Sequence, residues 1–218
     1  FFIMGGGALL LSLSSFLPDN ISAVIAEQMG HKEWHGFAFY DLIFPLFLFL
    51  AGVSFPFSLS KMGKNKSRML FKIVRRALIL LFLGVLYNGL LNFDFENLRY
   101  ASVLGRIGLA WALAALIYLF GGKKVSIAVS VILLLGYWAL LALVKAPDAL
   151  PEIDIYSMEG SIVGYIDRLF LPGALHLGIH DPEGLLSTLP AVVTAMAGIF
   201  TGEFVRDNKV KEYRIMGL

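Results

Sequence analysis

The stretch HKEWHGFAFYDLIFPLFLFLAG, residues 31–52, joins a cluster of titratable side chains to a long apolar segment. His31 and His35 stand four residues apart in the cluster, and Asp41 interrupts the apolar part. A carboxylate inside a hydrophobic helix is costly unless it is paired or lines water, so such acids usually serve a function or have a partner. Arg106, at a comparable depth in another apolar segment, is the candidate for an ion pair with Asp41, and this pair would still allow Asp41 to orient a histidine.

The chain as a whole has the composition of an integral membrane protein. Of its residues, 58% are hydrophobic and only 16% are charged, which is less charge than a soluble domain carries. Six windows free of Lys, Arg, Asp and Glu approach the roughly 20 residues that a spanning helix needs. We therefore expect one all-α domain, residues 1–218, built as a polytopic bundle of about six transmembrane helices. The windows are 1–18, 42–60, 77–93, 107–122, 125–144 and 184–202.

The distribution of basic residues predicts the orientation of the bundle. Short loops rich in Lys and Arg stay cytoplasmic, and segment 61–76 carries seven such residues and no acid. Alternation of the spans then places segments 121–124 and 203–218 on the same cytoplasmic side. The opposite, outer side receives segments 19–41, 94–106 and 145–183, and with them all four histidines of the chain.

The histidines are the candidates for chemistry on that outer side. His31 and His35, like His176 and His180, have the i, i+4 spacing of a helical metal-ligand pair. Gly178 and the Asp-Pro step that follows His180 disfavour a helix for the second pair, so we expect no metal site. Imidazole exchanges protons near neutral pH, which favours acid–base or nucleophilic work. The alternative is that these histidines only form hydrogen bonds at the membrane interface.

The basic segment 61–76 has two interpretations. Its charges can set topology and contact anionic lipid, or some of them, Arg75 and Arg76 above all, can bind the phosphates of a cytoplasmic cofactor. The chain has no Walker loop and no G-x-G-x-x-G fingerprint, which argues against the standard nucleotide-binding folds. A net charge of only +2 gives no case for nucleic acid, and the absence of cysteine excludes thiolate chemistry.

Three motifs together resemble the heparan-α-glucosaminide N-acetyltransferase family of transmembrane acyltransferases, and its bacterial branch in particular. The first has the family's H-x-x-W-N-G pattern followed by D-L-x-x-P, with His35 in place of the usual Asn. The second motif is similar to the family's L-R-x-x-G-V-L-x-R-x-G segment. The third is similar to the family's G-Y-I-D-R-L segment followed by D-P-E-G. In this chain they read HKEWHG and DLIFP (31–45), LRYASVLGRIGLAW (98–111), GYIDRLFL (164–171) and HDPEGLLST (180–188).

Two departures from the family pattern stand near the start of the chain. Animal members carry an Asn before the glycine run, where this chain has Ile3 and Met4, so Asn20 is the remaining candidate for that contribution. The family also continues through further helices, and Phe1 opens the chain without an initiator Met. We expect the chain to be a piece of a longer protein, with a little over half of the catalytic part present.

The resemblance implies that an acetyl group moves from cytosolic acetyl-CoA, across the membrane, to the amine of a glucosamine-type sugar. His31 takes the place of the family's catalytic histidine, as the base for the amine or as the acceptor of the acetyl group in an acyl-imidazole. The expected roles of the other residues follow. Asp41 assists His31, whereas Trp34, His35, Asp181 and Glu183 bind the sugar, and Arg75, Arg76 and Arg106 bind acetyl-CoA.

Other functions and some details stay open at this stage. A sugar or small-anion transporter is the alternative, because Pro45 and Pro56 can break the second span as helices break around transporter sites. A non-catalytic membrane scaffold explains less. We expect a bacterial inner membrane with the His31 site facing the periplasm and with lipid as a partner. The acceptor sugar and the oligomeric state stay open, with a homo-oligomer among the options.

Overall fold

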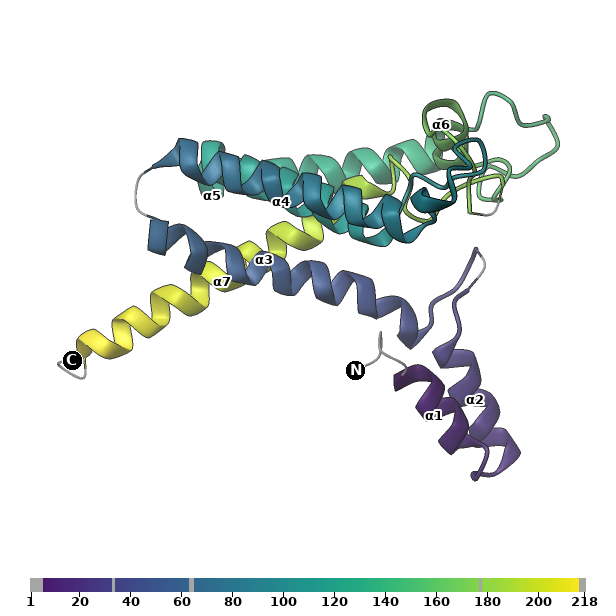
Figure 1. Ribbon diagram of the computed structural model, residues 1–218, viewed down its shortest axis with the longest axis horizontal. Helices are drawn as coiled ribbons and strands as arrows, with labels where there is room; N and C mark the ends of the chain where they lie inside the picture. Colours follow the sequence, from purple (N-terminus) through teal and green to yellow (C-terminus); the bar gives the residue numbers. More distant parts are fainter. Residues whose placement is uncertain (1–5, 33, 63–64, 177, 216–218) are drawn as a thin grey trace. The chain divides into compact units, whose positions relative to one another are not determined.

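The computed structural model describes residues 6–32, 34–62, 65–176 and 178–215, and these are mainly helical (Figure 1). Within these ranges the only β-type pairing consists of isolated bridges, so the predicted all-α class is confirmed. The α-helices are α1 (Gly7–Ser14), α2 (Asp19–Met29), α3 (Ile43–Met62), α4 (Lys66–Tyr87), α5 (Val103–Leu143), α6 (Ile162–Phe170) and α7 (Thr188–Ile215). Two short 3-10 helices, η2 (Phe39–Leu42) and η3 (Leu90–Asn92), stand before α3 and after α4.

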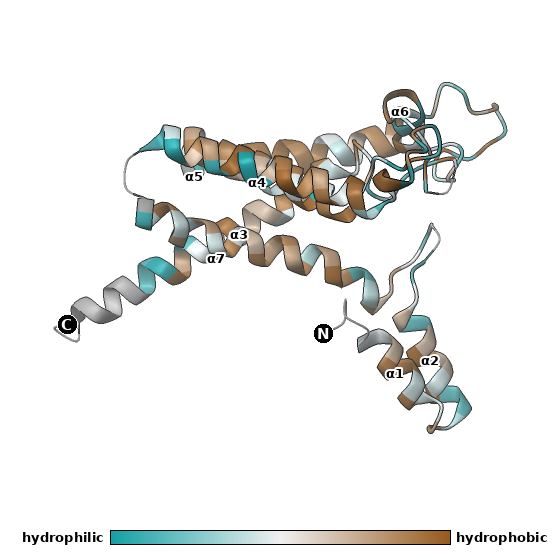
Figure 2. Ribbon diagram, in the orientation of Figure 1, coloured by the Kyte–Doolittle hydropathy of each residue, from teal (hydrophilic) through white to brown (hydrophobic). Residues whose placement is uncertain are grey.

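Three helical segments of the described chain are long and apolar enough to cross a membrane, judged by length and composition: Phe39–Lys61, Val103–Leu143 and Thr188–Asn208. They mark the chain as a membrane protein. The predicted count of six spans is not confirmed. In the window 1–18 the described helix, α1, has only eight residues, and the window 77–93 falls in α4 and η3. Figure 2 shows that α4 begins with hydrophilic residues and becomes apolar only further along.

Much of the predicted basic loop, 61–76, is helical, which corrects its assignment as a loop. The side chain of Asn65 accepts a hydrogen bond from the backbone N–H of Arg68 at 3.1 Å, and this cap starts α4 at Lys66. The basic residues from Lys66 to Arg76 therefore lie on the first three turns of a helix. The predicted outer segments 19–41 and 145–183 likewise contain α2 and α6.

Helix α5 reverses direction at Gly122, whose φ of 68° and ψ of −173° are not helical. Trp111, before the glycine, donates a hydrogen bond to the carbonyl of Ala51 at 3.1 Å. The neighbour of Ala51, Gly52, packs on the carbonyl of Ala195, and Ser130, after the reversal, donates to Met196. A straight helix would separate Trp111 and Ser130 by about 28 Å at 1.5 Å per residue. Both instead reach the same level of α7, so the windows 107–122 and 125–144 are two arms of a hairpin.

The chain divides into two compact units, residues 1–47 and 48–218. In the first unit, α1 and α2 pack together and the hydroxyl of Ser22 donates to that of Ser14 at 3.3 Å. Gly7 lies against the ring of Tyr40, where a Cβ would be 3.1 Å from the nearest ring carbon. Glycine at position 7 thus lets Tyr40 pack closely against α1.

In the second unit, α5 packs against both α4 and α7, and α7 also meets α3 at very short range. A Cβ on Gly198 would overlap the carbonyl oxygen of Phe49, and one on Gly202 would overlap that of Val53. Small residues allow membrane helices to approach to backbone contact, which replaces the hydrophobic driving force that the lipid removes. This packing fixes the walls of the cavity described below.

Candidate functional site

His31 and Asp41 form a hydrogen-bonded pair in the first unit. Nδ1 of His31 lies 2.7 Å from Oδ1 of Asp41, across ten residues of sequence. His31 follows the end of α2 at Met29, and Asp41 lies on η2, where the apolar segment begins. In the tautomer in which Nδ1 of His31 donates to the Asp41 carboxylate, Nε2 of the neutral ring presents a lone pair. The His31 side chain is 69% exposed, which leaves the imidazole accessible.

The Asp41 carboxylate is also fixed from its other side. Its Oδ2 accepts the backbone N–H of Ala38 at 2.9 Å, so both oxygens have a donor. The ring of Tyr40 meets that of His31 edge-on, with centroids 5.0 Å apart. Asp41 thus holds the ring of His31 in place by hydrogen bonding, and Tyr40 adds a packing contact.

Trp34 and His35, the two other predicted residues of this stretch, contact each other. Their rings meet edge-on with centroids 6.0 Å apart. His35 is exposed and Trp34 is half-buried. The loop between α2 and η2 therefore carries His31, Trp34 and His35, and η2 carries Asp41. A hydrogen bond fixes the side chains of His31 and Asp41 relative to each other.

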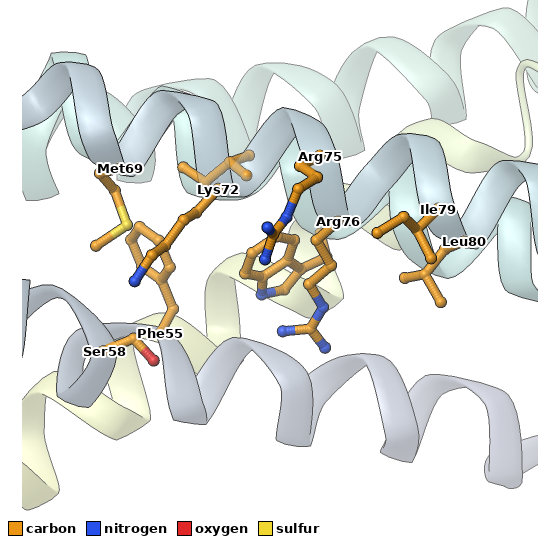
Figure 3. A pocket seen from close by; sticks show the side chains of 10 residues that line it. Phe55, Ser58, Met69, Lys72, Arg75, Arg76, Ile79 and Leu80 are labelled. Carbon is orange, nitrogen blue, oxygen red and sulfur yellow. The ribbon is translucent and has the colours of Figure 1, made fainter.

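In the second unit, α4 presents three basic side chains to a cavity of about 430 Å³. Lys72, Arg75 and Arg76 have the i, i+3, i+4 spacing that places side chains on one helix face. Figure 3 shows them extending from α4 toward α3. The remaining walls are mostly apolar and come from α3, α4 and α5: Phe55, Ser58, Met69, Ile73, Ile79, Leu80 and Trp111.

An aromatic contact orients Arg76 in this cavity. Its guanidinium carbon lies 4.3 Å from the centroid of the Trp111 ring, within the range of a cation–π interaction. The Trp111 ring is itself fixed by its hydrogen bond to Ala51 and by an edge contact with Phe55, with centroids 6.0 Å apart. The structure therefore brings together Arg75 and Arg76, as predicted for the cofactor, and adds Lys72 and Trp111, which sequence reasoning did not select.

The second and third motifs meet in a charge cluster of Arg99, Asp181 and Glu183. Nε of Arg99 donates to Oδ2 of Asp181 at 2.7 Å, and Nη2 donates to Oδ1 at 2.6 Å and also to Glu183. Asp181 further accepts the backbone N–H groups of His176 and Glu183, at 3.1 and 2.9 Å. The Asp181 side chain is fully buried, and its oxygens accept hydrogen bonds from the loop before α7 and from Arg99. The Glu183 side chain keeps 15% exposure.

The cluster shifts the acid–base behaviour of its members. Burial by itself would raise the pKa of Asp181, but the hydrogen bonds and positive charge of Arg99 outweigh burial and hold this pKa below its usual value. The hydrogen bonds to Asp181 and the charges of both acids also raise the pKa of Arg99. The pair is therefore ionised over the whole physiological pH range.

Asp167, on α6, is a second buried carboxylate beside this cluster. It accepts the backbone N–H of Leu185 at 2.9 Å and that of Asp181 at 3.4 Å, and a Cβ on Gly184 would overlap it. Burial raises the pKa of Asp167, although these two N–H groups oppose the rise. Asp167 thus ties α6 to the D-P-E-G turn, and only glycine at position 184 leaves room for the carboxylate.

Two further arginines fasten the same loop. Arg106 donates to the carbonyls of Pro182 and Ser187, at 2.8 and 2.6 Å. Arg168 donates to the carbonyl of Ile179 at 2.6 Å and forms a bidentate pair with Asp148. Arg106, predicted to bind acetyl-CoA, is thus committed to backbone carbonyls of the loop that carries Asp181. The predicted ion pair between Arg106 and Asp41 stays a prediction, because the two residues lie in different units of the chain.

Sequence reasoning missed Arg99, Asp167 and Arg168 as site residues. A signal was present, because all three stand inside the motif strings LRYASVLGR and GYIDRL. The other two histidines lie between α6 and α7, with His176 exposed and His180 buried, and neither is helical. Among the described residues, no three His, Asp or Glu side chains are grouped so as to hold a metal ion.

Comparison with known proteins gives the relatives of the chain. It is 26% identical to heparan-alpha-glucosaminide N-acetyltransferase of Mus musculus and 27% identical to that of Homo sapiens, over 80% and 85% of its own length. The chain is related to these acetyltransferases. The resemblance predicted from the three motifs is confirmed, whereas its placement in a bacterial branch stays a prediction. No family model matches the chain.

The chain spans about a third of the length of heparan-alpha-glucosaminide N-acetyltransferase, 34% of the mouse protein and 36% of the human one.

Proposed function

We propose that the chain contributes the catalytic histidine of a membrane N-acetyltransferase. The acetyl group would come from acetyl-CoA on the cytoplasmic side and go to the amine of a glucosamine-type sugar on the opposite side. The observation that carries this proposal is the 2.7 Å hydrogen bond between His31 and Asp41, in a chain whose relatives are named as N-acetyltransferases. The sidedness follows from the basic residues of the sequence.

The geometry of the pair suits proton transfer from an amine. Attack on a thioester carbonyl requires an amine that loses a proton as the new C–N bond forms and the C–S bond breaks. Nε2 of His31 can accept that proton, and the imidazolium that results is stabilised by the negative charge of Asp41. The coenzyme A thiolate that leaves can then take the proton back, so the pair returns to its starting state.

The same atom can act as a nucleophile. In this route Nε2 of His31 attacks the thioester, the coenzyme A thiolate leaves, and an acetyl-imidazole forms. The sugar amine then attacks the acetyl carbon, loses its proton and releases the imidazole. Asp41 supports both routes, because it keeps the proton on Nδ1 and the lone pair on Nε2.

We propose supporting roles for the remaining residues. Trp34 and His35 flank the histidine on the same loop and would contact the sugar. Glu183 keeps some exposure and would face the positively charged amine, whereas the buried Asp181 would position Arg99 and Glu183. Arg106 would hold the same loop through Pro182 and Ser187 rather than touch acetyl-CoA directly.

The test is an acetyl-transfer assay on the full-length protein in lipid nanodiscs, with labelled acetyl-CoA and a panel of amino sugars. Transfer to glucosamine or to a glucosamine-terminated glycan, abolished in His31→Ala, would support the proposal. Absence of transfer to every amino sugar, together with passage of unmodified sugar into proteoliposomes, would replace the proposal with a transporter.

A further inference from the structure

The ring of Tyr40 contacts both helix α1 and the imidazole of His31 in the first unit. Toward His31 the two rings meet edge-on, with centroids 5.0 Å apart and an angle of 75° between their planes. Toward α1 the ring lies against Gly7, where a Cβ would be 3.1 Å from Cε2 of Tyr40. Gly7 ends the run of three glycines at residues 5–7, to which the proposed function gives no role. Tyr40 therefore connects this glycine to the histidine.

A single hydrogen bond does not fix the orientation of the His31 ring. The contact between Nδ1 of His31 and Oδ1 of Asp41, at 2.7 Å, sets the position of one ring atom and leaves the ring free to turn about the line of the bond. The His31 side chain is 69% exposed, so packing restrains little of it. The edge contact with Tyr40 lies at another part of the ring and restricts that turn. The direction in which Nε2 points thus depends on both contacts.

Tyr40 is itself held in place through η2 and α2. Its neighbour on η2, Phe39, donates its backbone N–H to Oε1 of Gln28, near the end of α2, at 3.0 Å. Helix α2 in turn packs on α1, which carries Gly7. No described residue forms a hydrogen bond with the Tyr40 hydroxyl, so the ring of Tyr40 makes the contacts on both sides. The fit between this ring and α1 therefore decides where the ring meets His31.

We infer that Tyr40 is a positioning residue for His31, and that glycine is needed at position 7 to leave room for the Tyr40 ring. Asp41 fixes Nδ1 of the imidazole and Tyr40 fixes the plane of the ring, so that Nε2 points in one direction. The benefit for acetyl transfer rests on the proposed function, because a catalytic group has to be aligned with the reacting atoms. The restraint on the ring does not rest on it and can be measured by itself.

The first arm of the test measures how freely the His31 ring moves, by solid-state nuclear magnetic resonance of the full-length protein with labelled histidine in lipid bilayers. The order parameter of the ring should fall in Tyr40→Leu, which removes the aromatic edge. It should keep its wild-type value in Tyr40→Phe, which retains that edge. The His31 signal is identified by its loss in His31→Gln. An unchanged order parameter in Tyr40→Leu would overturn the inference.

Substitutions of glycine separate the position of the ring from the stability of the fold. Gly7→Ala places a Cβ 3.1 Å from the Tyr40 ring and Gly7→Leu a larger side chain, so the ring has to move, although both residues favour a helix more than glycine does. Gly30→Ala is the matched control beside His31, because its backbone is extended and the nearest atom to its Cβ would be 3.6 Å away. Both Gly7 variants should lower the order parameter of the His31 ring, Gly7→Leu the more, whereas Gly30→Ala should not. Wild-type ring order in Gly7→Leu would overturn the role of Gly7.

The second arm measures acetyl transfer from labelled acetyl-CoA to glucosamine. Misalignment of a group that acts on the reacting atoms lowers kcat and kcat/KM together and leaves the KM of the sugar unchanged. Tyr40→Leu should show this pattern with a fall of about tenfold, and Tyr40→Phe should transfer like wild type. A raised KM with unchanged kcat would overturn the inference, because Tyr40 would then contact the sugar.

The two arms distinguish failure of the inference from failure of the proposed function. If ring order falls in Tyr40→Leu but wild type transfers no acetyl group to any sugar, the proposed function fails and the restraint on His31 stands. If wild type transfers acetyl groups and Tyr40→Leu matches it in both turnover and ring order, the proposed function stands and the inference fails.

Discussion

Arg99 and Asp181 form a two-point pair across 82 residues of sequence, with Nε to Oδ2 at 2.7 Å and Nη2 to Oδ1 at 2.6 Å. The acid is fully buried and the arginine side chain is 23% exposed. The pair connects the segment before α5 to the turn before α7. It joins the second and third motifs, which resemble those of the acetyltransferases, into one unit.

Breaking this pair from one side should destabilise the protein strongly. Arg99→Gln leaves the buried carboxylate of Asp181 without its cation, at a cost of about 3–5 kcal/mol. Thermal unfolding in detergent, followed by tryptophan fluorescence or circular dichroism, should show a much lower midpoint. Lys145→Gln is the control, because Lys145 is half-buried and donates to the backbone carbonyls of Leu150 and Pro151 rather than to a buried carboxylate. An Arg99→Gln midpoint equal to that of the control would contradict the structural role of the pair.

The depressed pKa of Asp181 predicts an acid-dependent stability. A carboxyl whose pKa is lower in the folded state than in the unfolded state stabilises the fold fully above its unfolded value, about 3.9, and loses this contribution as the pH falls through the folded value. The midpoint of wild type should therefore drop below about pH 4. In Asp181→Asn the drop should be shallower, from a lower starting point. Parallel curves for the two proteins would argue against this assignment.

His31→Ala should lower acetyl transfer by about 100-fold or more, because positioned acid–base groups contribute factors of this size. Coenzyme A binding should be retained, since the histidine is proposed to act on the acetyl end. His35→Asn is the matched control and should keep near-normal turnover, because Asn is the residue that the family usually has there. Near-normal turnover in His31→Ala would show that another residue is the catalyst.

The two chemical routes can be separated by labelling without acceptor. An acetyl-imidazole predicts a burst of label on the protein when acetyl-CoA is added alone, and this burst should be absent in His31→Ala. The label should chase onto glucosamine when the sugar is added. Normal turnover without any burst would favour His31 as a general base.

Membrane sidedness can be measured directly because the chain has no cysteine. A cysteine in place of His176 should react with an impermeant thiol reagent from the outer side in intact cells, and one in place of Lys61 should not. The expectation rests on the basic residues of segment 61–76. The reverse labelling pattern would place the His31 site on the cytoplasmic side and remove the case for transfer across the membrane.

Sequence reasoning predicted the class of the fold because apolar windows and basic segments are visible along the chain. It also selected His31 and Asp41, since a charged group in an apolar segment is expensive wherever the chain folds. The expectation that Asp41 assists His31 came from the family resemblance, whereas their direct hydrogen bond could not be read from the sequence, because the nine residues between them carry no periodic signal.

The same limit explains the cavity and the Arg99 cluster. Lys72 and Trp111 are far apart in sequence, and only the packing of α4 and α5 brings their side chains into one cavity. In segment 61–76, Asn65 before Lys66 was a readable helix start, yet the density of charge favoured a loop. Arg99 could be recognised as part of a motif but not paired with an acid 82 residues later.

The reversal of α5 at Gly122 bears on which side of a membrane each end of this helix faces. The segments on either side of α5 meet in one place, since Arg99 pairs with Gly173 in one β-bridge and Lys145 pairs with Ser161 in another, close to α6. Where residues 103–143 lie in a bilayer, such a hairpin returns the chain to the side from which it entered, so the number of crossings between these residues would be even. Reporters fused at the two ends of this hairpin should therefore report the same compartment, whichever side that is. A straight α5 would put them on opposite sides, so the reversal at Gly122 decides the side on which every later segment lies.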